Sequence, residues 1–172
     1  MNNIEGAIVT GFYGVGKSSV VEEIANQLDQ LDATYAAIDV DWLWWFNNPT
    51  FNDDQAKEVL LANLASITEN YKDAGVSKFI FAWSIRDKRD LEKINRVLSF
   101  PLKVIGLTAP MTVIEARLNS DVTSGRQNDL KNSQIWSEEG FDNSLLDLEI
   151  SNNQPIQRVA QEILEALNWH QI

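Results

Sequence analysis

One octapeptide near the start of the chain constrains this sequence more than any other feature. Residues 11–18 read GFYGVGKS and match the pattern G-x-x-x-x-G-K-[ST]. Glycines at these spacings let backbone N–H groups turn inward and approach an anion closely, and a helix N-terminus behind them adds positive potential. The pattern therefore predicts a phosphate-binding loop between a strand and a helix, with an ordinary glycine turn as the alternative.

Individual residues of this loop have expected roles. Lys17 would supply a compact positive charge to the β- and γ-phosphates of a nucleoside triphosphate, and Ser18 would offer its hydroxyl to Mg²⁺. The sequence thus predicts ATP and Mg²⁺ as cofactors, although it does not distinguish ATP from GTP. The residues of this segment expected to bind the nucleotide are Gly11, Tyr13, Gly14, Val15, Gly16, Lys17, Ser18 and Ser19.

Composition narrows the remaining chemistry. The 172 residues suit one domain, and the chain contains no cysteine and a single histidine, which excludes thiolate chemistry and disfavours histidine-based metal sites. The formal net charge of −11 opposes nucleic-acid binding, which requires basic patches. Because the sequence shows neither a signal peptide nor an apolar stretch long enough to span a bilayer, we expect a cytoplasmic protein that binds no membrane.

Apolar periodicity predicts strands that alternate with helices. Short apolar runs indicate strands, whereas apolar residues that recur every three to four positions indicate helices. Alternation of this kind implies right-handed crossovers and a mostly parallel sheet with helices on both faces. We therefore predict an α/β fold in one domain over residues 1–172. The expected strands are 4–10, 34–40, 78–83, 102–108 and 145–150, and the expected helices are 18–31, 53–74, 87–98, 110–119 and 155–167.

The stretch from residue 121 to 133 has no clear periodicity. It is polar, contains a glycine, and follows the fourth expected strand and its helix. Irregular segments of this length often form lids over a bound ligand, although an inert surface connection is the alternative. The sequence therefore predicts an irregular lid at about 119–133.

Two aspartates close the second expected strand. Asp39 and Asp41 are alternate residues, so both carboxylates can face the carboxyl edge of the sheet, beside the phosphate-binding loop. One would orient an acceptor hydroxyl or accept its proton, and the other would hold Mg²⁺ through water. The alternative is a turn-forming pair that caps the next segment.

These segments together resemble a known family. The residues GFYGVGKSS, AAIDVDWLWW and LTAPMTVIEARL are similar to those of the P-loop small-molecule kinases, which include shikimate, gluconate and adenylylsulfate kinases and chloramphenicol phosphotransferase. The resemblance spans nearly the whole chain in order. It implies a three-layer P-loop NTPase fold with a five-stranded parallel sheet in the order 2-3-1-4-5, and transfer of the γ-phosphoryl group of ATP to a hydroxyl of a small molecule.

The resemblance also implies roles for single residues. Asp39 matches the carboxylate near Mg²⁺ that acts as base or orienter, and Asp41 matches the one that binds the acceptor. Arg117 matches an arginine that packs against adenine or reaches the phosphates. Arg126 would be the lid arginine over the γ-phosphate. The turn after the fifth strand, Ser151-Asn152-Asn153, would pass the adenine edge, with Asn153 as the expected nucleotide contact. With Lys17 of the loop, Asp39 and Arg126 are the expected catalytic residues.

Two departures from the family pattern leave alternatives open. Asp121 stands where the family often has a second lid arginine, which favours a nucleotide-dependent switch or a catalytically weak kinase relative. No Gly-Gly-Gly run follows the third strand, where the sequence reads AWSIRD, so the shikimate site is absent. A nucleotide or nucleotide-sugar kinase, similar to the polynucleotide-end kinases or zeta-type toxins, is the remaining alternative.

The aromatic run WLWWF at 42–46 is the main candidate for acceptor recognition. Its four aromatic side chains form either a wall for a flat or apolar acceptor or a helix packed on the sheet, and we expect packing for at least two of them. Arg86 would pair with an anionic acceptor or form a surface salt bridge. Neither the acceptor nor the oligomeric state follows from the sequence. The residues predicted to contact the acceptor are Asp41, Trp42, Trp45, Ser84 and Arg86.

Overall fold

The computed structural model describes residues 3–120, 124–139 and 142–170, with the backbone alone for 124–127 and 138–139. Within these ranges, five parallel strands form one sheet in the order β2-β3-β1-β4-β5. The predicted α/β fold and its strand order 2-3-1-4-5 are therefore confirmed. The strands are β1 (Glu5–Thr10), β2 (Tyr35–Asp39), β3 (Lys78–Ala82), β4 (Leu102–Thr108) and β5 (Leu148–Ser151).

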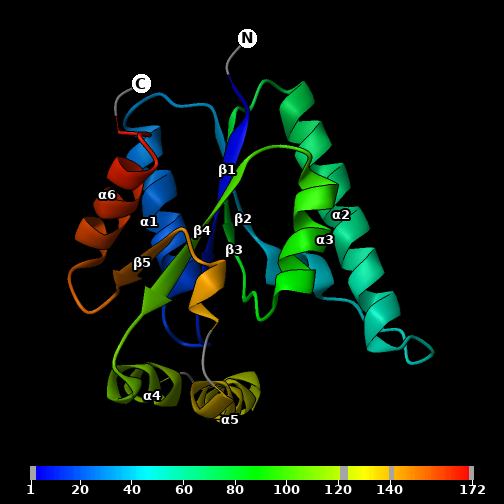
Figure 1. The fold of residues 1–172 in the computed structure, drawn as a ribbon, viewed down its shortest axis with the longest axis vertical. Coiled ribbons are helices and arrows are strands. Elements are labelled where there is room, and N and C mark those ends of the chain that lie inside the picture. Colours follow the sequence, from blue (N-terminus) through cyan, green and yellow to red (C-terminus); the bar gives the residue numbers. More distant parts are fainter. Residues whose placement is uncertain (1–2, 121–123, 140–141, 171–172) are drawn as a thin grey trace.

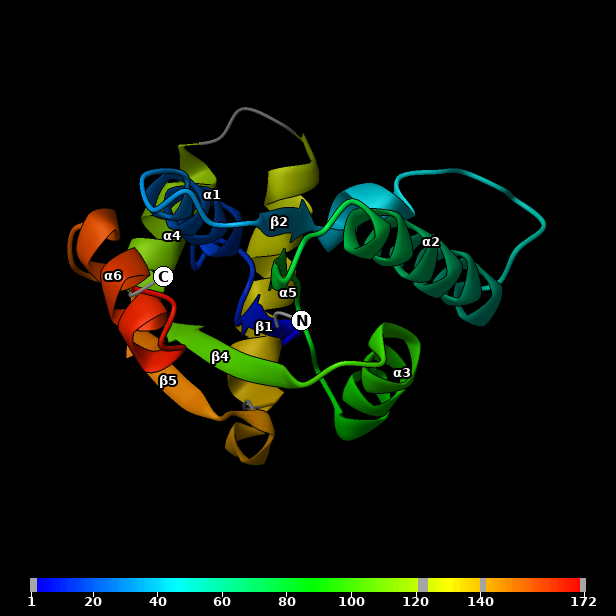
Figure 2. The same ribbon diagram turned by 90° about the horizontal axis from the view of Figure 1, so that it is seen from above.

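Helices cover both faces of the sheet and its carboxyl edge. Figures 1 and 2 show α1 and α6 on one face, α2 and α3 on the other, and α4 and α5 beyond the ends of the strands. Among the described helices, none is both long and apolar enough to cross a lipid bilayer. The helices are α1 (Lys17–Asp29), α2 (Asp53–Asp73), α3 (Lys88–Leu98), α4 (Met111–Asn119), α5 (Ser124–Glu139) and α6 (Ile156–Ala166), with two 3₁₀ helices, η1 (Val40–Trp44) and η2 (Asn143–Leu145).

The central strand β1 divides the core into two clusters. Ala7 and Val9 belong to the cluster beneath α1 and α6, whereas Ile8 belongs to the cluster beneath α2 and α3. All three side chains are buried, because successive residues of a strand point to opposite faces and both faces of β1 are covered. The position of β1 is thus fixed from both sides, and with it the loop that follows at the carboxyl edge.

The segment expected to be an irregular lid is mostly a helix, so that part of the prediction is wrong. Residues 124–139 form α5, while 121–123 lie outside the described residues. Few apolar side chains mark the packed face of α5: Leu130 is half-buried, and Ser133 and Trp136 are buried. Because a serine takes one position of that stripe, the hydrophobic periodicity that identifies helices is weak here.

The fifth strand also begins later than expected. Leu145 belongs to η2 and β5 starts at Leu148, because the side chain of Asp142 accepts a hydrogen bond from the Ser144 backbone N–H and starts a tight turn. This aspartate–serine contact is the kind of local side-chain bond that competes with a strand.

Candidate active site

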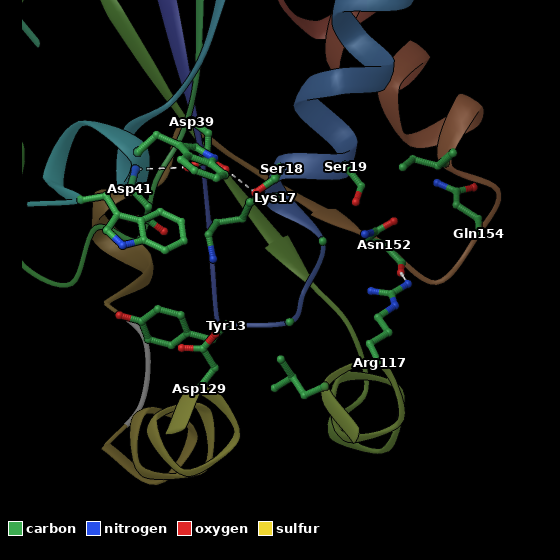
Figure 3. A pocket seen from close by; sticks show the side chains of 16 residues that line it. Tyr13, Lys17, Ser18, Ser19, Asp39, Asp41, Arg117, Asp129, Asn152 and Gln154 are labelled. Carbon is green, nitrogen blue, oxygen red and sulfur yellow. Dashed lines mark hydrogen bonds between the residues drawn. The ribbon is translucent and has the colours of Figure 1, made fainter. Parts of the chain in front are cut away.

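A cavity of about 710 Å³ opens at the carboxyl edge of the sheet, within the range of small-ligand sites. It lies between the glycine-rich loop, η1, α4, α5 and the turn that follows β5 (Figure 3). Five segments that are distant in the sequence therefore contribute to one site. Its lining residues are Tyr13, Gly14, Gly16, Lys17, Ser18, Ser19, Asp39, Asp41, Trp42, Trp45, Arg117, Leu118, Asp129, Asn152, Gln154 and Ile156.

The glycine-rich loop connects β1 to α1, as its sequence pattern predicts. Gly14 and Gly16 have φ angles of 77° and 103°, which disfavour any other residue. A Cβ atom on Gly16 would lie 2.6 Å from Nδ2 of Asn152, and one on Gly14 would lie 2.6 Å from Cγ of Leu118. Gly16 is the N-cap of α1 and supplies no side-chain cap. The first N–H groups of α1 are thus left for an anion to satisfy.

Lys17 is folded back along this loop. Its Nζ atom donates hydrogen bonds to the carbonyl oxygens of Gly11 and Phe12, at 3.0 and 3.1 Å, and lies 5.3 Å from the centre of the Tyr13 ring. The residue is only 8% exposed, so its charge requires such partners. Lys17 also lines the cavity, so the glycine-rich loop contributes a positive charge to it.

Ser18 and Asp39, the two residues predicted to hold a metal, lie together. The Ser18 hydroxyl donates a hydrogen bond to Oδ2 of Asp39 over 2.6 Å, and the Asp41 backbone N–H donates to Oδ1 over 3.1 Å. Hydroxyl and carboxylate oxygens suit Mg²⁺, which usually keeps several waters and takes only one or two protein carboxylates. The absence of any cluster of three or more His, Cys, Asp or Glu among the described residues is compatible with such a site.

Arg117 and Asn152 join the loop to α4 and to the end of β5. The Arg117 guanidinium donates to the carbonyl oxygens of Val15 and Asn152, at 2.8 and 3.0 Å, and Nδ2 of Asn152 donates to Val15 over 2.7 Å. Sequence analysis proposed Asn153 at this turn, but Asn153 is exposed and absent from the cavity lining, whereas its neighbours Asn152 and Gln154 line it. Side chains alternate in direction along this turn, so Asn152 and Gln154 face the cavity while Asn153 between them faces outward.

On the opposite side of the cavity, Asp41, Trp42 and Trp45 form the lining. The indole side chains of Trp42 and Trp45 are 67% and 77% exposed, and their ring centres lie 4.7 Å apart. The structure describes all four aromatic residues in 42–46. Of these, only Trp44 packs on the core, because Phe46, like Trp42 and Trp45, is exposed, at 39%. The expectation that at least two of the four would pack is therefore wrong. Residues three apart in a 3₁₀ helix lie on one side, which brings Trp42 and Trp45 together.

Two other predicted residues lie outside the cavity lining, and the side chain of a third is not described. Ser84 and Arg86 do not line the cavity. The Ser84 hydroxyl is buried without a hydrogen-bond partner among the described residues, and the Arg86 guanidinium lies 5.0 Å from the centre of the Trp136 ring. Arg126 belongs to α5, but its side chain falls outside the described part of the structure.

Helix α5 adds a carboxylate that sequence analysis did not anticipate. Asp129, Ser133 and Trp136 follow an i, i+4, i+7 spacing and share one face of the helix. The Ser133 hydroxyl donates to the Tyr13 carbonyl oxygen over 2.8 Å, the Trp136 ring makes edge contacts with Phe12 and Tyr13, and Asp129 lines the cavity. No signal in the sequence identifies this residue, because the hydrophobic periodicity of α5 is weak and Asp129 reaches the cavity only through the contact of α5 with the glycine-rich loop.

The phenol of Tyr13 lies near three charged side chains, those of Arg86, Asp41 and Asp129. Burial raises its pKa above 10.0, the negative charges of Asp41 and Asp129 raise it further, and the charge and hydrogen bond of Arg86 act in the opposite direction. Tyr13 thus keeps its hydroxyl proton at neutral pH and presents a neutral hydrogen-bonding group next to the cavity.

The sheet order, the glycine-rich loop and its position at the carboxyl edge define a P-loop fold of the type found in small-molecule kinases. No protein-family model matches the chain, and no curated protein matches its sequence. Solved structures nevertheless share the fold over nearly their full length.

Three of these structures illustrate the similarity. A sugar kinase from Janibacter sp. HTCC2649 has a TM-score of 0.68 and 19% identity, and the match covers 96% of this chain and 95% of that one. A gluconokinase from Sinorhizobium meliloti has a TM-score of 0.65 and 20% identity, with 98% and 94% covered. The APS kinase of Mycobacterium tuberculosis, solved with AMPPNP and APS, has a TM-score of 0.66 and 17% identity, with 98% and 99% covered. These TM-scores show a common fold, and identities of 17–20% carry the similarity no further than the fold.

Proposed function

We propose that this protein is an ATP-dependent kinase that transfers the γ-phosphoryl group to a hydroxyl of a small molecule. The observation that carries the proposal is the convergence of Lys17, the Ser18–Asp39 pair and Asp41 on one cavity. The first three are the groups that triphosphate and Mg²⁺ require, and Asp41 lies next to them, where an acceptor would approach. The solved kinases of the same fold support this proposal.

Catalysis in such a site depends on positioning and electrostatics. The loop N–H groups and Lys17 bind the β- and γ-phosphates, while Ser18 and Asp39 hold Mg²⁺. The bound metal ion supplies positive charge that offsets charge developing on the phosphates. Asp39 and Asp41 orient the acceptor hydroxyl, and either carboxylate can accept its proton. Arg126 is proposed to close over the γ-phosphate.

The side of the cavity lined by Arg117 and Asn152, away from Trp42 and Trp45, is proposed to hold the nucleoside (Figure 3). Arg117 lies beside Val15 and Asn152, and Gln154 and Ile156 extend the lining there. This combination offers a planar guanidinium for stacking and an apolar side chain for the base. Asn153 lies in the same turn but does not line the cavity, so we propose its neighbour Asn152 as the contact at the edge of the adenine. A cytoplasmic location, where ATP is abundant, accords with this function.

The test is ADP release from Mg·ATP across a library of hydroxyl-bearing compounds, with the Lys17→Ala protein as the control. We expect one compound class to stimulate ADP release by the unmodified protein, and Lys17→Ala to lower that rate by at least about a hundredfold, because the variant removes the charge opposite the transferring phosphate.

Two outcomes would contradict this expectation. Turnover that is unchanged in Lys17→Ala would refute the assignment of the loop. Slow hydrolysis that no compound stimulates would favour a nucleotide-dependent switch. Circular dichroism of the variant checks that the fold is retained.

A further inference from the structure

The side of the cavity where the acceptor is proposed to bind exposes two large aromatic side chains. Two of the largest apolar side chains of the chain, Trp42 and Trp45, are more exposed than buried, and both line the cavity. Exposed aromatic pairs of this kind usually mark a binding surface, because burying them against a partner recovers their hydrophobic free energy. Val40 and Leu43, on another side of η1, are buried and half-buried, so η1 itself is anchored to the sheet.

Two carboxylates and a phenol line the same cavity as this indole pair. Asp41 comes from η1 and Asp129 from α5, and Tyr13 lies near both of them (Figure 3). Both aspartates also have interactions within the chain. A carboxylate nevertheless offers about four acceptor positions, so each can still accept a hydrogen bond from a ligand. A ligand at this side must therefore present several donors as well as an apolar face.

Charge restricts the ligand further. Among the described lining residues, the cationic side chains are Lys17 and Arg117, and both donate hydrogen bonds to backbone carbonyls of the loop or the adjacent turn. Asp41 and Asp129 contribute negative charge to the acceptor side of this cavity, whereas Asp39 is proposed to hold Mg²⁺. An anionic acceptor would be repelled by these carboxylates, whereas a neutral or cationic one would not.

From this arrangement we infer that the acceptor is a polyhydroxylated ring without negative charge, that is, a neutral sugar or an amino sugar. The C–H face of such a ring stacks on Trp42 and Trp45, and its hydroxyl or ammonium groups donate to Asp41 and Asp129. An aromatic alcohol would satisfy the indoles but offers too few donors for the carboxylates. Asp129, on α5, thus becomes a specificity residue. The inference rests on the proposed kinase function and names its substrate class.

The experiment compares three classes of acceptor at equal concentration in the ADP-release assay. The classes are neutral and amino sugars, sugar acids and sugar phosphates, and aromatic alcohols without a sugar ring. We expect only the first class to stimulate ADP release in a Lys17-dependent way. Comparison of neutral sugars with amino sugars within that class then shows which of the two is the acceptor. Stimulation by either other class, or none by the first, would overturn the inference.

Binding of ATP, measured by isothermal titration calorimetry, separates failure of the inference from failure of the proposed function. If the unmodified protein binds Mg·ATP and Lys17→Ala does not, but no sugar stimulates turnover, only the acceptor class is wrong. If neither protein binds Mg·ATP, the proposed kinase function fails as well.

Variants with matched controls test the residues themselves. The double change Trp42→Ala and Trp45→Ala should raise the acceptor KM about tenfold or more, while the ATP KM changes less than about twofold. Phe46→Ala is the control, because Phe46 is exposed in the same segment but does not line the cavity. An equal effect of both changes on the acceptor KM would contradict stacking.

Asp129 is tested in the same way. Asp129→Asn should raise the KM of an amino sugar about tenfold and that of a neutral sugar less, because the variant keeps a hydrogen-bond acceptor and removes the charge. Asp54→Asn, in the first turn of α2 and away from the cavity, is the control. An unchanged KM for both sugars in Asp129→Asn would remove Asp129 from the site.

Discussion

At the scale of single residues, Gly16 shows how closely the loop fits its surroundings. Arg117 and Asn152 approach the Val15 carbonyl from two different elements, and this leaves no room for a side chain at the next position. Gly75, which follows α2, has a similar φ of 89°, but a Cβ atom there would meet nothing within 4 Å. A side chain at Gly75 would therefore meet only backbone strain, whereas one at Gly16 would meet both backbone strain and a steric clash.

We predict that Gly16→Ala and Gly75→Ala differ in their effects. Gly75→Ala should cost about 1 kcal/mol of unfolding free energy, which is the strain of a positive φ alone. Gly16→Ala should cost about 2–4 kcal/mol and abolish nucleotide binding, because Asn152 must move and its bond to Val15 is lost. Urea unfolding and calorimetry measure both quantities. Equal losses of stability, with nucleotide binding retained, would show that the loop tolerates displacement of Asn152.

At the scale of elements, helix α3 depends on one capping residue. The Asp87 side chain accepts a hydrogen bond from the Asp90 backbone N–H over 2.9 Å. This bond is the main cause that lowers the pKa of Asp87 below 3.8; slight burial opposes it, and Arg89 assists it. A lowered pKa in the folded state means that the stabilisation is present above pH 3.8 and is lost as the pH falls through the folded value.

We predict that Asp87→Ala costs about 1 kcal/mol at pH 7 and less at about pH 3, since protonation already weakens the cap of the unmodified protein there. Asp87→Asn retains a capping oxygen that does not titrate, so its advantage over Asp87→Ala should be the same at both pH values. Chemical unfolding of the three proteins provides the measurement. A deficit of Asp87→Ala that is constant with pH would show that the cap does not depend on the charge.

The elements also show what the sequence could and could not predict. Strands β1 and β3 contain the apolar runs AIV and FIFA, so burial on both faces made these strands predictable. The sheet order, in contrast, was expected only from the resemblance to P-loop small-molecule kinases. Helix α5 was missed because its packed face contains Ser133 instead of an apolar residue. In the site, Lys17 and Ser18 follow from a motif with a fixed mechanism, whereas Asp39 was expected from its place at the end of the second strand and from the family resemblance. Asp129 becomes a lining residue only through contacts between distant segments, which no local pattern encodes. The turn that contains Asn152 was expected, but the sequence did not show that Asn152 and not Asn153 faces the cavity.

At the scale of the whole molecule, the two faces of the sheet and its carboxyl edge have different functions. Helices α1 and α6 cover one core cluster, and α2 and α3 cover the other. Helices α4 and α5 pack on each other beyond the strand ends, where Ile114 and Leu118 of α4 join the first cluster (Figure 1). Trp169 and Trp136 represent these two settings. Trp169 belongs to the core cluster and donates a hydrogen bond to Glu5, while Trp136 joins α5 to Phe12 and Tyr13 of the loop.

These two buried tryptophans should respond differently to truncation. Trp169→Ala should cost about 3–5 kcal/mol of global stability, because it opens a large cavity in the core. Trp136→Ala should cost less globally, but it should release α5 from the loop, increase hydrogen exchange in 124–139, and lower turnover. Thermal unfolding, hydrogen exchange and the ADP-release assay distinguish the two. If Trp136→Ala lowered the melting temperature as much as Trp169→Ala, with exchange raised throughout the chain, α5 would be part of the folding core and its docking would not be a separate step. If exchange in α5 rose while turnover stayed unchanged, contact between α5 and the loop would have no part in catalysis.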